Sequence, residues 1–370
     1  MRQIKHIMLV GNTAWSMCNF RGGLIRHLVE CGYRVSVLAP EEASARKRIE
    51  ESGAAFYDLP LEAKGTNPIK DFQLLLRLKR MLKAIKPDFA FFYTIKPNIY
   101  GGIAAHACGV PFIAVTTGLG YTFIENNWVS RIARRMYKFS FKNARKVWFL
   151  NQEDCKDFLR YRLLPADKCF VLKGEGVDTK RFAAEPLPHK PVFLLMARML
   201  WDKGIGEYVE AARMLKREFP DAEFNLLGFL NVENPSAISR RQMDAWVEEG
   251  VVNYLGVTSD VVPYLRETLA IVLPSYREGI PVTLLEAASM QRIVVTSDAV
   301  GCRDVVDDGK TGFMCRVKDA QSLADKMRQV IVMNDEQRMR MGQAAREKVL
   351  REFDQQLVFD QYDRVLENME

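Results

Sequence analysis

A buried strand, a short loop and a helix follow one another at residues 269–288, and this unit constrains the fold more than any other stretch. Leu269–Leu273 is an unbroken apolar run that ends at Pro274. Such a run is typical of a strand covered on both faces. Pro281 stands where the following helix begins, the position at which proline is best tolerated. The unit therefore predicts an α/β domain with a parallel sheet.

Two glutamates flank the start of this helix. Glu278 lies in the loop before it, and Glu286 lies one to two turns inside it, between apolar residues. Gly279 allows a ligand to approach the backbone, and the free N–H groups of a first helical turn attract an anion. Carboxylates beside such an anion site suit a phosphorylated, polyhydroxylated ligand such as a sugar nucleotide. The competing interpretation is an ordinary crossover with solvated glutamates, which the apolar neighbours of Glu286 disfavour.

The length of 370 residues suffices for two domains, each with its own core. No apolar segment approaches the roughly 20 residues that span a bilayer, and the N-terminus lacks a signal-peptide pattern. The seven cysteines are scattered without CxxC spacing, so we expect reduced cysteines in a cytoplasmic protein. The four histidines are unclustered and no Asp-x-Asp triplet occurs, which predicts that no structural zinc and no obligate metal is needed.

The net charge of +7 conceals a strong asymmetry between the two halves of the chain. Residues 1–185 hold 30 basic and 17 acidic residues, a balance of +13, whereas the remainder is at −6. A basic first half indicates an anionic partner, either nucleic acid or an anionic membrane. Chance segregation of charge is the alternative.

The first half opens with a strand–loop–helix–strand pattern over Ile4–Leu38, typical of a Rossmann-like domain. Ligands of such domains bind beyond the carboxyl ends of the strands. The segment lacks G-x-G-x-x-G, and Ala39-Pro40 stands where an acidic residue would end the second strand. Dinucleotide binding is therefore disfavoured.

Polar loops follow three predicted strands of this half, Ile4–Val10, Asp88–Tyr93 and Phe112–Thr116. We interpret these loops as the side of the site that receives an acceptor. The residues concerned are Gly11, Asn12, Thr13, Thr94, Lys96, Asn98, Thr117 and Gly118. A loop in which Asn98 merely caps a helix over Ile99–Cys108 is an equally open interpretation.

Residues 128–142 combine a helical apolar stripe with many cations. Ile132, Met136 and Phe139 recur at i, i+4 and i+7. The cations beside them are Arg131, Arg134, Arg135, Lys138 and Lys142. Such a helix can lie on an anionic membrane, where each Lys or Arg contributes roughly 1 kcal/mol. Packing on the domain with a solvated basic edge is the alternative.

The glycines of Lys173–Asp178 and the prolines of 184–191 mark a domain boundary. We predict a first domain over 1–180, a second over 190–350, and a final helix over 351–370 that crosses back to the first. In the second domain Arg198 ends a strand and Lys203 precedes a helix, which places two cations where a diphosphate would bind. Gly301–Val306 is expected to begin a further helix.

Taken together, these residues resemble the retaining glycosyltransferases of family 4, which have two Rossmann-like domains facing across a cleft, the B-type fold. The resemblance is carried by Gly11 after the first strand, Gly174–Asp178 at the boundary, Arg198 with Lys203-Gly204, and Glu278 with Glu286. It spans nearly the whole chain.

Several segments are similar, more narrowly, to bacterial transferases that add a HexNAc, often N-acetylgalactosamine, to a polyprenyl-diphosphate-linked sugar in N-glycan or O-antigen assembly. These segments are Asn12-Thr-Ala-Trp15, Thr94–Gly101, Gly118-Leu-Gly-Tyr121, Ala197–Gly204 and Val232–Ser236.

The resemblance implies a role for each matching position. Arg198 and Lys203 would neutralise the departing diphosphate. Glu278, with the amides of Gly279, Ile280, Pro281 and Val282 (proline contributing no N–H), would hold the donor sugar and phosphate. Glu286 would bind the ribose, and the backbone near Leu255 and Gly256 the uracil. Many members of the family place a histidine where this chain has Thr117-Gly118, so that sugar contact is not carried over.

The resulting hypothesis is a cytoplasmic, membrane-peripheral transferase with a UDP-sugar donor, an undecaprenyl-diphosphate saccharide acceptor and no obligate metal. One alternative is a hexosyltransferase that uses UDP-glucose, UDP-galactose or GDP-mannose. The other is a non-catalytic nucleic-acid-binding protein, which the paired glutamates and the lack of an RNA-reading motif disfavour.

Overall fold

The computed structural model describes residues 4–62, 65, 67–118 and 128–368, which divide into two compact units. The first unit consists of residues 1–175 and 355–370, and the second of residues 176–354. The chain enters the second unit after Glu175, within the glycine-containing segment that marks the boundary in the sequence.

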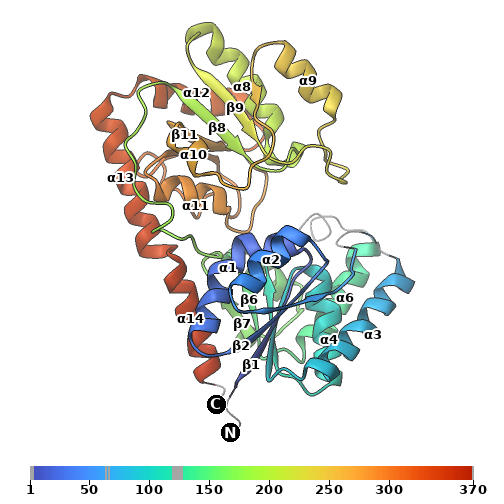
Figure 1. Ribbon diagram of the computed structural model, residues 1–370. Helices are drawn as coiled ribbons and strands as arrows, with labels where there is room; N and C mark the ends of the chain where they lie inside the picture. Colours follow the sequence, from blue (N-terminus) through green and yellow to red (C-terminus); the bar gives the residue numbers. More distant parts are fainter. Residues whose placement is uncertain (1–3, 63–64, 66, 119–127, 369–370) are drawn as a thin grey trace. The chain divides into compact units, whose positions relative to one another are not determined.

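The first unit is built on a seven-stranded parallel sheet with the order β3-β2-β1-β4-β5-β6-β7 (Figure 1). Its strands are β1 (His6–Val10), β2 (Arg34–Ala39), β3 (Ala55–Asp58), β4 (Phe89–Tyr93), β5 (Phe112–Thr116), β6 (Lys146–Phe149) and β7 (Cys169–Val171). Its helices are α1 (Ala14–Glu30), α2 (Ala43–Glu51), α3 (Pro68–Ile85), the π-helix η1 (Pro97–Gly101), α4 (Gly102–Ala107), α6 (Trp128–Phe141), α7 (Gln152–Arg160), the 3-10 turn η2 (Ala166–Lys168) and α14 (Gln355–Glu367).

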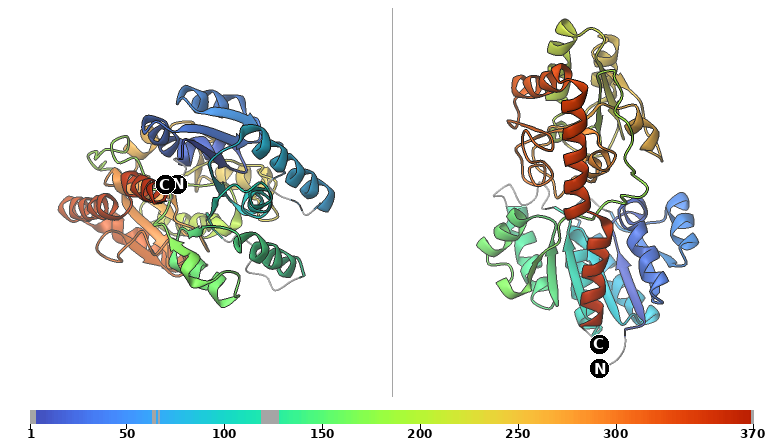
Figure 2. Two further views of the ribbon diagram at one scale, coloured as in Figure 1. Left: turned by 90° about the horizontal axis from the view of Figure 1, so that it is seen from below. Right: turned by 90° about the vertical axis from the view of Figure 1, so that its left-hand side faces the viewer.

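Alternate residues of each strand pack on opposite faces of this sheet. Met8 and Val10 belong to a core cluster with residues of α3, α4 and α6. On the other face, Tyr362 of α14 lies with its ring centroid 4.8 Å from those of both Phe91 and Trp148. Figure 2 shows α14, in red, running along this unit. The last helix is therefore part of the first unit's core.

The second unit repeats the plan with a six-stranded parallel sheet in the order β10-β9-β8-β11-β12-β13. Its strands are β8 (Val192–Met196), β9 (Glu223–Leu227), β10 (Asn253–Tyr254), β11 (Ala270–Leu273), β12 (Ile293–Ser297) and β13 (Phe313–Cys315). Its helices are η3 (Trp201–Lys203), α8 (Ile205–Glu218), α9 (Arg240–Glu248), α10 (Val262–Arg266), α11 (Val282–Ser289), α12 (Ala320–Val332) and α13 (Asp335–Glu352). Both units thus have the Rossmann-like order in which the chain reverses beside the first strand, and the prediction of two such domains is confirmed.

Some local expectations differ from the structure. The first helix, expected over Phe20–Cys31, begins at Ala14 because Thr13 caps it, accepting a hydrogen bond from the Ser16 N–H at 3.1 Å. The expected loop before Ile99 is already helical, since η1 begins at Pro97. The expected helix at Gly301–Val306 is wrong, because these residues form turns.

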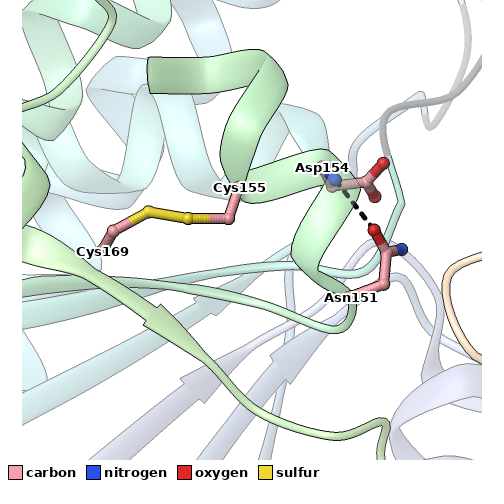
Figure 3. Close-up of a disulfide and its surroundings, with 4 residues drawn as sticks. All are labelled: Asn151, Asp154, Cys155 and Cys169. Carbon is pink, nitrogen blue, oxygen red and sulfur yellow. Dashed lines mark hydrogen bonds between the residues drawn. A yellow bond between two sulfur atoms is a disulfide. The ribbon is translucent and has the colours of Figure 1, made fainter. Parts of the chain in front are cut away.

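The expectation that all cysteines are reduced is wrong for one pair, since Cys155 and Cys169 form a disulfide (Figure 3). Asn151 caps α7, accepting a hydrogen bond from the Asp154 N–H at 2.8 Å. This cap orients α7 so that Cys155 faces the start of β7. The pairing depends on the return of the chain along β7, which no CxxC spacing announces.

Among the residues that the structure describes, none of the helices combines the length and the apolar character needed to cross a bilayer.

Candidate active site

The predicted donor loops lie at the point where the strand order of the second unit reverses. β8 pairs with β11, and the loops that leave their carboxyl ends contain Arg198–Gly204 and Pro274–Pro281. In sheets of this order ligands bind in the crevice at this point. The fold therefore brings together loops whose residues Lys203 and Glu278 are 75 residues apart in the sequence.

Lys203 and Glu278 form an ion pair across these two loops. Both side chains are largely buried, with exposed fractions of 16% and 14%. The Ser275 hydroxyl donates to the same Glu278 oxygen, Oε1, at 2.7 Å. The two residues predicted to contact phosphate and sugar thus neutralise each other.

Glycines allow the loops to pack closely. Gly204 has a φ of +73°, and a Cβ built on it would lie 2.2 Å from the Pro274 carbonyl oxygen. Gly301 has a φ of +82°, and its Cβ would lie 2.3 Å from the Gly279 carbonyl oxygen. The Glu278 N–H donates to the Val300 carbonyl at 2.9 Å. A side chain at either glycine would push the glutamate loop away from its support.

The start of α11 presents uncapped backbone N–H groups. Pro281 is its N-cap and makes no side-chain capping bond, and Val282 is its first residue. Ile280 and Pro281 are buried, which fixes the entry of the chain into the helix. The first-turn N–H groups therefore suit a phosphate or a sugar hydroxyl.

Glu286 lies one turn further along α11. Burial raises the pKa of its carboxyl group to about 8, and the nearby Arg181 charge opposes the rise only in part. The side chain nevertheless retains partial exposure to solvent. Among the described residues it forms no hydrogen bond or ion pair. It is a carboxyl group in low-dielectric surroundings whose oxygens are available to a ligand.

Arg198 follows β8, whereas Leu255 and Gly256 follow β10, two strands away in the same sheet. Arg198 is exposed just beyond β8 and makes no side-chain ion pair within the described part of the chain. The Leu255 N–H donates a hydrogen bond to the Leu226 carbonyl at 2.8 Å, and the Gly256 carbonyl accepts one from the Gly228 N–H at 2.8 Å. The Leu255 carbonyl and the Gly256 N–H are the groups left for a base.

In the first unit the predicted acceptor loops also meet at a chain reversal, between β1 and β4. Gly11 follows β1, and its N–H donates to the Leu38 carbonyl at 3.0 Å. Asn12 and Thr13 are half-buried, Thr13 as the cap of α1. Thr94 follows β4 with a φ of +71°, an unusual conformation for a threonine. These loops share one edge of the sheet.

Within the described part of the chain, the buried hydroxyl groups of Thr94 and Thr116 at this edge have no hydrogen-bond partner. Buried polar groups are rarely left unsatisfied, so each is a candidate contact for a ligand or water. Thr117 and Gly118 follow, half-buried, and Gly118 has a φ of +134°. The remainder of the Gly118–Tyr121 segment lies outside the described residues.

Lys96 and Asn98 each contact another element of the first unit. The Lys96 ammonium donates to Asp71 at 2.7 Å, and the Tyr100 hydroxyl donates to the same carboxylate at 2.8 Å. Asn98 is fully buried and its side-chain N–H donates to the Val115 carbonyl at 3.0 Å. The capping interpretation of Asn98 is wrong, because this side chain bridges η1 to β5 inside the core.

Sequence reasoning missed a buried cluster in the same unit. Arg21 of α1 forms an ion pair with Glu175, and its guanidinium carbon lies 4.1 Å from the ring centroid of Tyr93. Burial raises the pKa of Glu175, and Arg21 opposes the rise. Arg21 and Glu175 are 154 residues apart, and an arginine within an apolar helix stripe was the only available signal.

The helix predicted to face a membrane exposes part of its apolar stripe. Ile132 and Phe139 of α6 have exposed fractions of 48% and 59%, whereas Tyr137 and Phe141 are buried against the sheet. Met136 is half-buried and packs on the core, so the predicted stripe is divided between the two faces. Of the cations, Arg131, Arg135, Lys138 and Lys142 are exposed. Arg134 instead packs its guanidinium carbon 3.9 Å from the ring centroid of Tyr161.

Among the described residues, His27, Cys31 and Asp363 form a group of three possible metal ligands. They lie on α1 and α14 rather than at a strand end. His27 already contacts the Asp363 carboxylate at 2.8 Å, so the group also has a purely structural explanation.

Comparisons with known proteins decide the family. The profile described as "Glycosyl transferases group 1" matches residues 177–348, and the "Glycosyl transferase 4-like domain" matches residues 20–174. Together the two profiles cover most of the chain. It is a glycosyltransferase.

Two curated relatives act on lipid-linked sugars. The N,N'-diacetylbacillosaminyl-diphospho-undecaprenol α-1,3-N-acetylgalactosaminyltransferase of Campylobacter jejuni is 29% identical, over 96% of this chain and 97% of its own. The UDP-Gal:α-D-GlcNAc-diphosphoundecaprenol α-1,3-galactosyltransferase of Escherichia coli is 25% identical, over 87% of this chain and 85% of its own. Among solved structures, Anabaena HepE in complex with UDP-glucose superimposes with a TM-score of 0.82 at 16% identity, covering 98% of this chain and 99% of the other. This likeness shows that the glycosyltransferase has the B-type fold.

Proposed function

We propose that this glycosyltransferase moves N-acetylgalactosamine, or another HexNAc, from a UDP donor to an undecaprenyl-diphosphate-linked saccharide. We further propose that it retains the anomeric configuration, needs no metal ion, and works at the cytoplasmic surface of an anionic membrane. The observation that carries the donor and acceptor is the similarity to the Campylobacter jejuni transferase along nearly the whole of both chains.

The paired charges at the strand reversal support the role of the second unit. Glu278 would leave Lys203 when the donor binds, accepting hydrogen bonds from the sugar hydroxyls while Lys203 turns to the diphosphate. Arg198, exposed and without an ion pair among the described residues, would add a second positive charge. Such fixed cations stabilise a departing diphosphate, which lets charge develop on the leaving group without a metal ion.

Retention follows if the acceptor attacks from the face that the diphosphate leaves. The bond between the anomeric carbon and the phosphate oxygen breaks, and its electron pair goes to the phosphate. The acceptor hydroxyl forms the new bond to the same carbon on the same face and passes its proton to the leaving phosphate oxygen. The Ser275 hydroxyl would keep its hydrogen bond to Glu278 after Lys203 has turned away, and so would hold the carboxylate beside the sugar.

A hexose donor is the second candidate, and the similarity to the Escherichia coli galactosyltransferase favours UDP-galactose among the hexoses. The two sugars differ at one substituent, an acetamido group in place of a hydroxyl. The backbone loops described above would accommodate either.

A donor panel tests the proposal directly. Purified enzyme is given UDP-N-acetylgalactosamine, UDP-N-acetylglucosamine, UDP-galactose, UDP-glucose and GDP-mannose with a polyprenyl-diphosphate HexNAc acceptor, with and without a chelator. We expect transfer from UDP-N-acetylgalactosamine, an α-linked product and no loss on chelation. A hexose product, a β linkage or a chelator-sensitive rate would each refute the corresponding part.

The site assignment has its own test. Glu278→Ala should lower the transfer rate at least about tenfold, because one positioned group contributes a hundredfold or more in comparable sites. Glu248→Ala, an exposed glutamate on α9, is the matched control and should keep full activity. Equal activity of the two variants would remove Glu278 from the reaction.

A further inference from the structure

A cavity of about 520 Å³ opens at the surface of the first unit, where α6 ends. It is lined by four cationic side chains, Lys138, Lys142, Arg162 and Lys168, and by apolar residues that include Leu159 and Leu163. None of its lining residues belongs to the strand-end loops of the candidate active site. The volume lies within the range of small-molecule sites.

The four cations have no ion-pair partner among the described residues. Lys168 donates instead to the carbonyl oxygens of Lys142, at 2.6 Å, and Ala144, at 2.9 Å. Burial lowers the pKa of Lys168, the Arg145 charge adds to this, and Asp167 opposes it. An anion from solution would supply these cations with a counterion.

The apolar part of the lining restricts what that anion is. Leu159 is half-buried, Leu163 is buried, and Leu164 and Pro165 complete the apolar wall. A free phosphate would neutralise the cations but would leave these apolar residues exposed to water. A molecule with both a phosphate and an apolar portion would use both parts of the cavity.

Most of the lining comes from one covalently closed segment. Leu159–Lys168 lies between Cys155 and Cys169, which the disulfide joins (Figure 3). The remaining wall is the last turn of α6. The disulfide keeps the two ends of the segment together, so the wall is anchored on both sides.

The cavity is continuous with the exposed face of α6. Lys142 lines it and lies three residues after the exposed Phe139, on the same side of the helix, while Lys138 lines it from the flank of that face. A helix that lies on a bilayer places its apolar residues among the acyl chains and its cations at the level of the headgroups. The cavity would then open at that level.

We propose that this cavity binds the phosphodiester headgroup of an anionic phospholipid, with the adjoining glycerol and acyl carbons against the leucines. The inference rests on the membrane-peripheral part of the proposed function. It adds a defined lipid site to what would otherwise be diffuse attraction between a basic surface and an anionic membrane.

Binding of a monomeric lipid tests the site without a membrane. The full chain is titrated with dihexanoyl phosphatidylglycerol below its micelle concentration, by calorimetry or tryptophan fluorescence. We expect saturable binding that weakens about thirtyfold in Lys142→Gln/Arg162→Gln, from roughly fivefold for each lost charge. Arg131→Gln/Arg135→Gln removes two exposed charges of α6 outside the cavity and should bind like the wild type.

Three other ligands separate the sources of the phosphate. Glycerol phosphate, which lacks acyl carbons, and dihexanoyl phosphatidylcholine, which lacks net charge, should each bind at least tenfold more weakly. Tighter binding of farnesyl diphosphate would assign the cavity to the lipid-linked acceptor and overturn the proposal. The proposal would also be overturned if both double variants lost the same affinity for dihexanoyl phosphatidylglycerol, or if glycerol phosphate bound as tightly as that lipid. Absence of saturable binding to the wild type would overturn it as well.

The titration contains neither donor nor acceptor, so it is independent of which sugar the enzyme transfers. Thermal unfolding of each variant checks its fold. If the double variant Lys142→Gln/Arg162→Gln does not fold, Lys138→Gln is measured in its place, with Arg135→Gln as the control.

Discussion

At the scale of single residues, the ion pair between Lys203 and Glu278 changes how both are understood. The sequence presents them as independent contacts to a phosphate and a sugar. The structure joins them across 75 residues with little exposure to solvent. Removing one partner from such a pair leaves a charge without compensation. A loss of activity in a Glu278 variant therefore counts as evidence for a role in the reaction only when the fold is intact.

Glu286 gives a pH dependence whose sign can be stated in advance. The pKa of its carboxyl group is about 8 in the folded protein, against an ordinary value of 4.5. Between pH 4.5 and pH 8 the folded protein therefore keeps a proton on this group that the unfolded chain has lost. The stability contributed is full at low pH and falls as pH rises toward 8. The fall is at most about 1.4 kcal/mol per pH unit, and partial exposure reduces it.

The comparison is with Glu286→Gln, which cannot ionise. Its melting temperature minus that of the wild type should increase from about pH 5 to pH 8, and then stop rising. Differential scanning calorimetry across this range measures the difference. A difference that is flat with pH would mean that the carboxyl group is well solvated in the folded protein.

At the scale of elements, α14 belongs to the core of a unit from which it is distant in sequence. Tyr362 is 1% exposed, packs on Phe91 and Trp148, and shares a hydrogen bond of 2.9 Å with the Tyr93 hydroxyl. We expect Tyr362→Ala to lower the free energy of unfolding of the first unit by about 3–5 kcal/mol. Leu357→Ala, at an exposed position of the same helix, should cost less than about 0.5 kcal/mol.

Urea unfolding followed by tryptophan fluorescence measures both variants, because Trp148 reports on this core directly. Tyr362→Phe keeps the ring but removes the bond to Tyr93 and should fall between them, at about 1–3 kcal/mol. Similar values for Tyr362→Ala and Leu357→Ala would show that α14 adds little to the stability of the unit.

The sequence predicts strands better than it predicts partners. Phe112–Thr116 has the same bounds in the prediction and in the structure, because a strand covered on both faces is a continuous apolar run. Lys96, by contrast, pairs with Asp71 on α3, and no periodicity reveals a contact between a strand end and a preceding helix. Cys155 and Cys169 were missed for the same reason: their pairing is set by how α7 lies on β7.

The candidate site shows the same difference between features that the sequence predicts and features that depend on tertiary contacts. Its segments could be located from the sequence, because the ends of parallel strands must share an edge and polar residues after apolar runs mark those ends. The sequence could not predict which of these side chains remain available to a ligand. Asn98 is equally polar in the sequence, yet the structure buries it completely and its side-chain N–H donates to the Val115 carbonyl, whereas the Thr94 side chain is only half-buried. Availability depends on three-dimensional neighbours rather than on residue type.

At the scale of the whole molecule, the two units have the same sheet plan but different polar groups at their chain reversals. The second offers a cation, carboxyl groups and an uncapped helix start at its chain reversal, whereas the first offers hydroxyl groups and a basic surface. UDP alone should therefore act on the second unit. Ligand that binds only the folded state stabilises it by RT ln(1 + [L]/Kd), which is about 2.7 kcal/mol at a hundredfold excess over Kd.

Hydrogen exchange of the full chain resolves where that stabilisation falls. With saturating UDP we expect slower exchange in peptides that cover 198–204, 253–257 and 274–286, because the ligand would occupy their backbone amides or block their opening. Peptides of β1, β4 and β5 should exchange as before, since the base and diphosphate would contact only the second unit. Protection confined to the first unit would reverse the assignment of the two units. Protection in the second unit that persists in Glu286→Gln would show that the ribose is held by other groups.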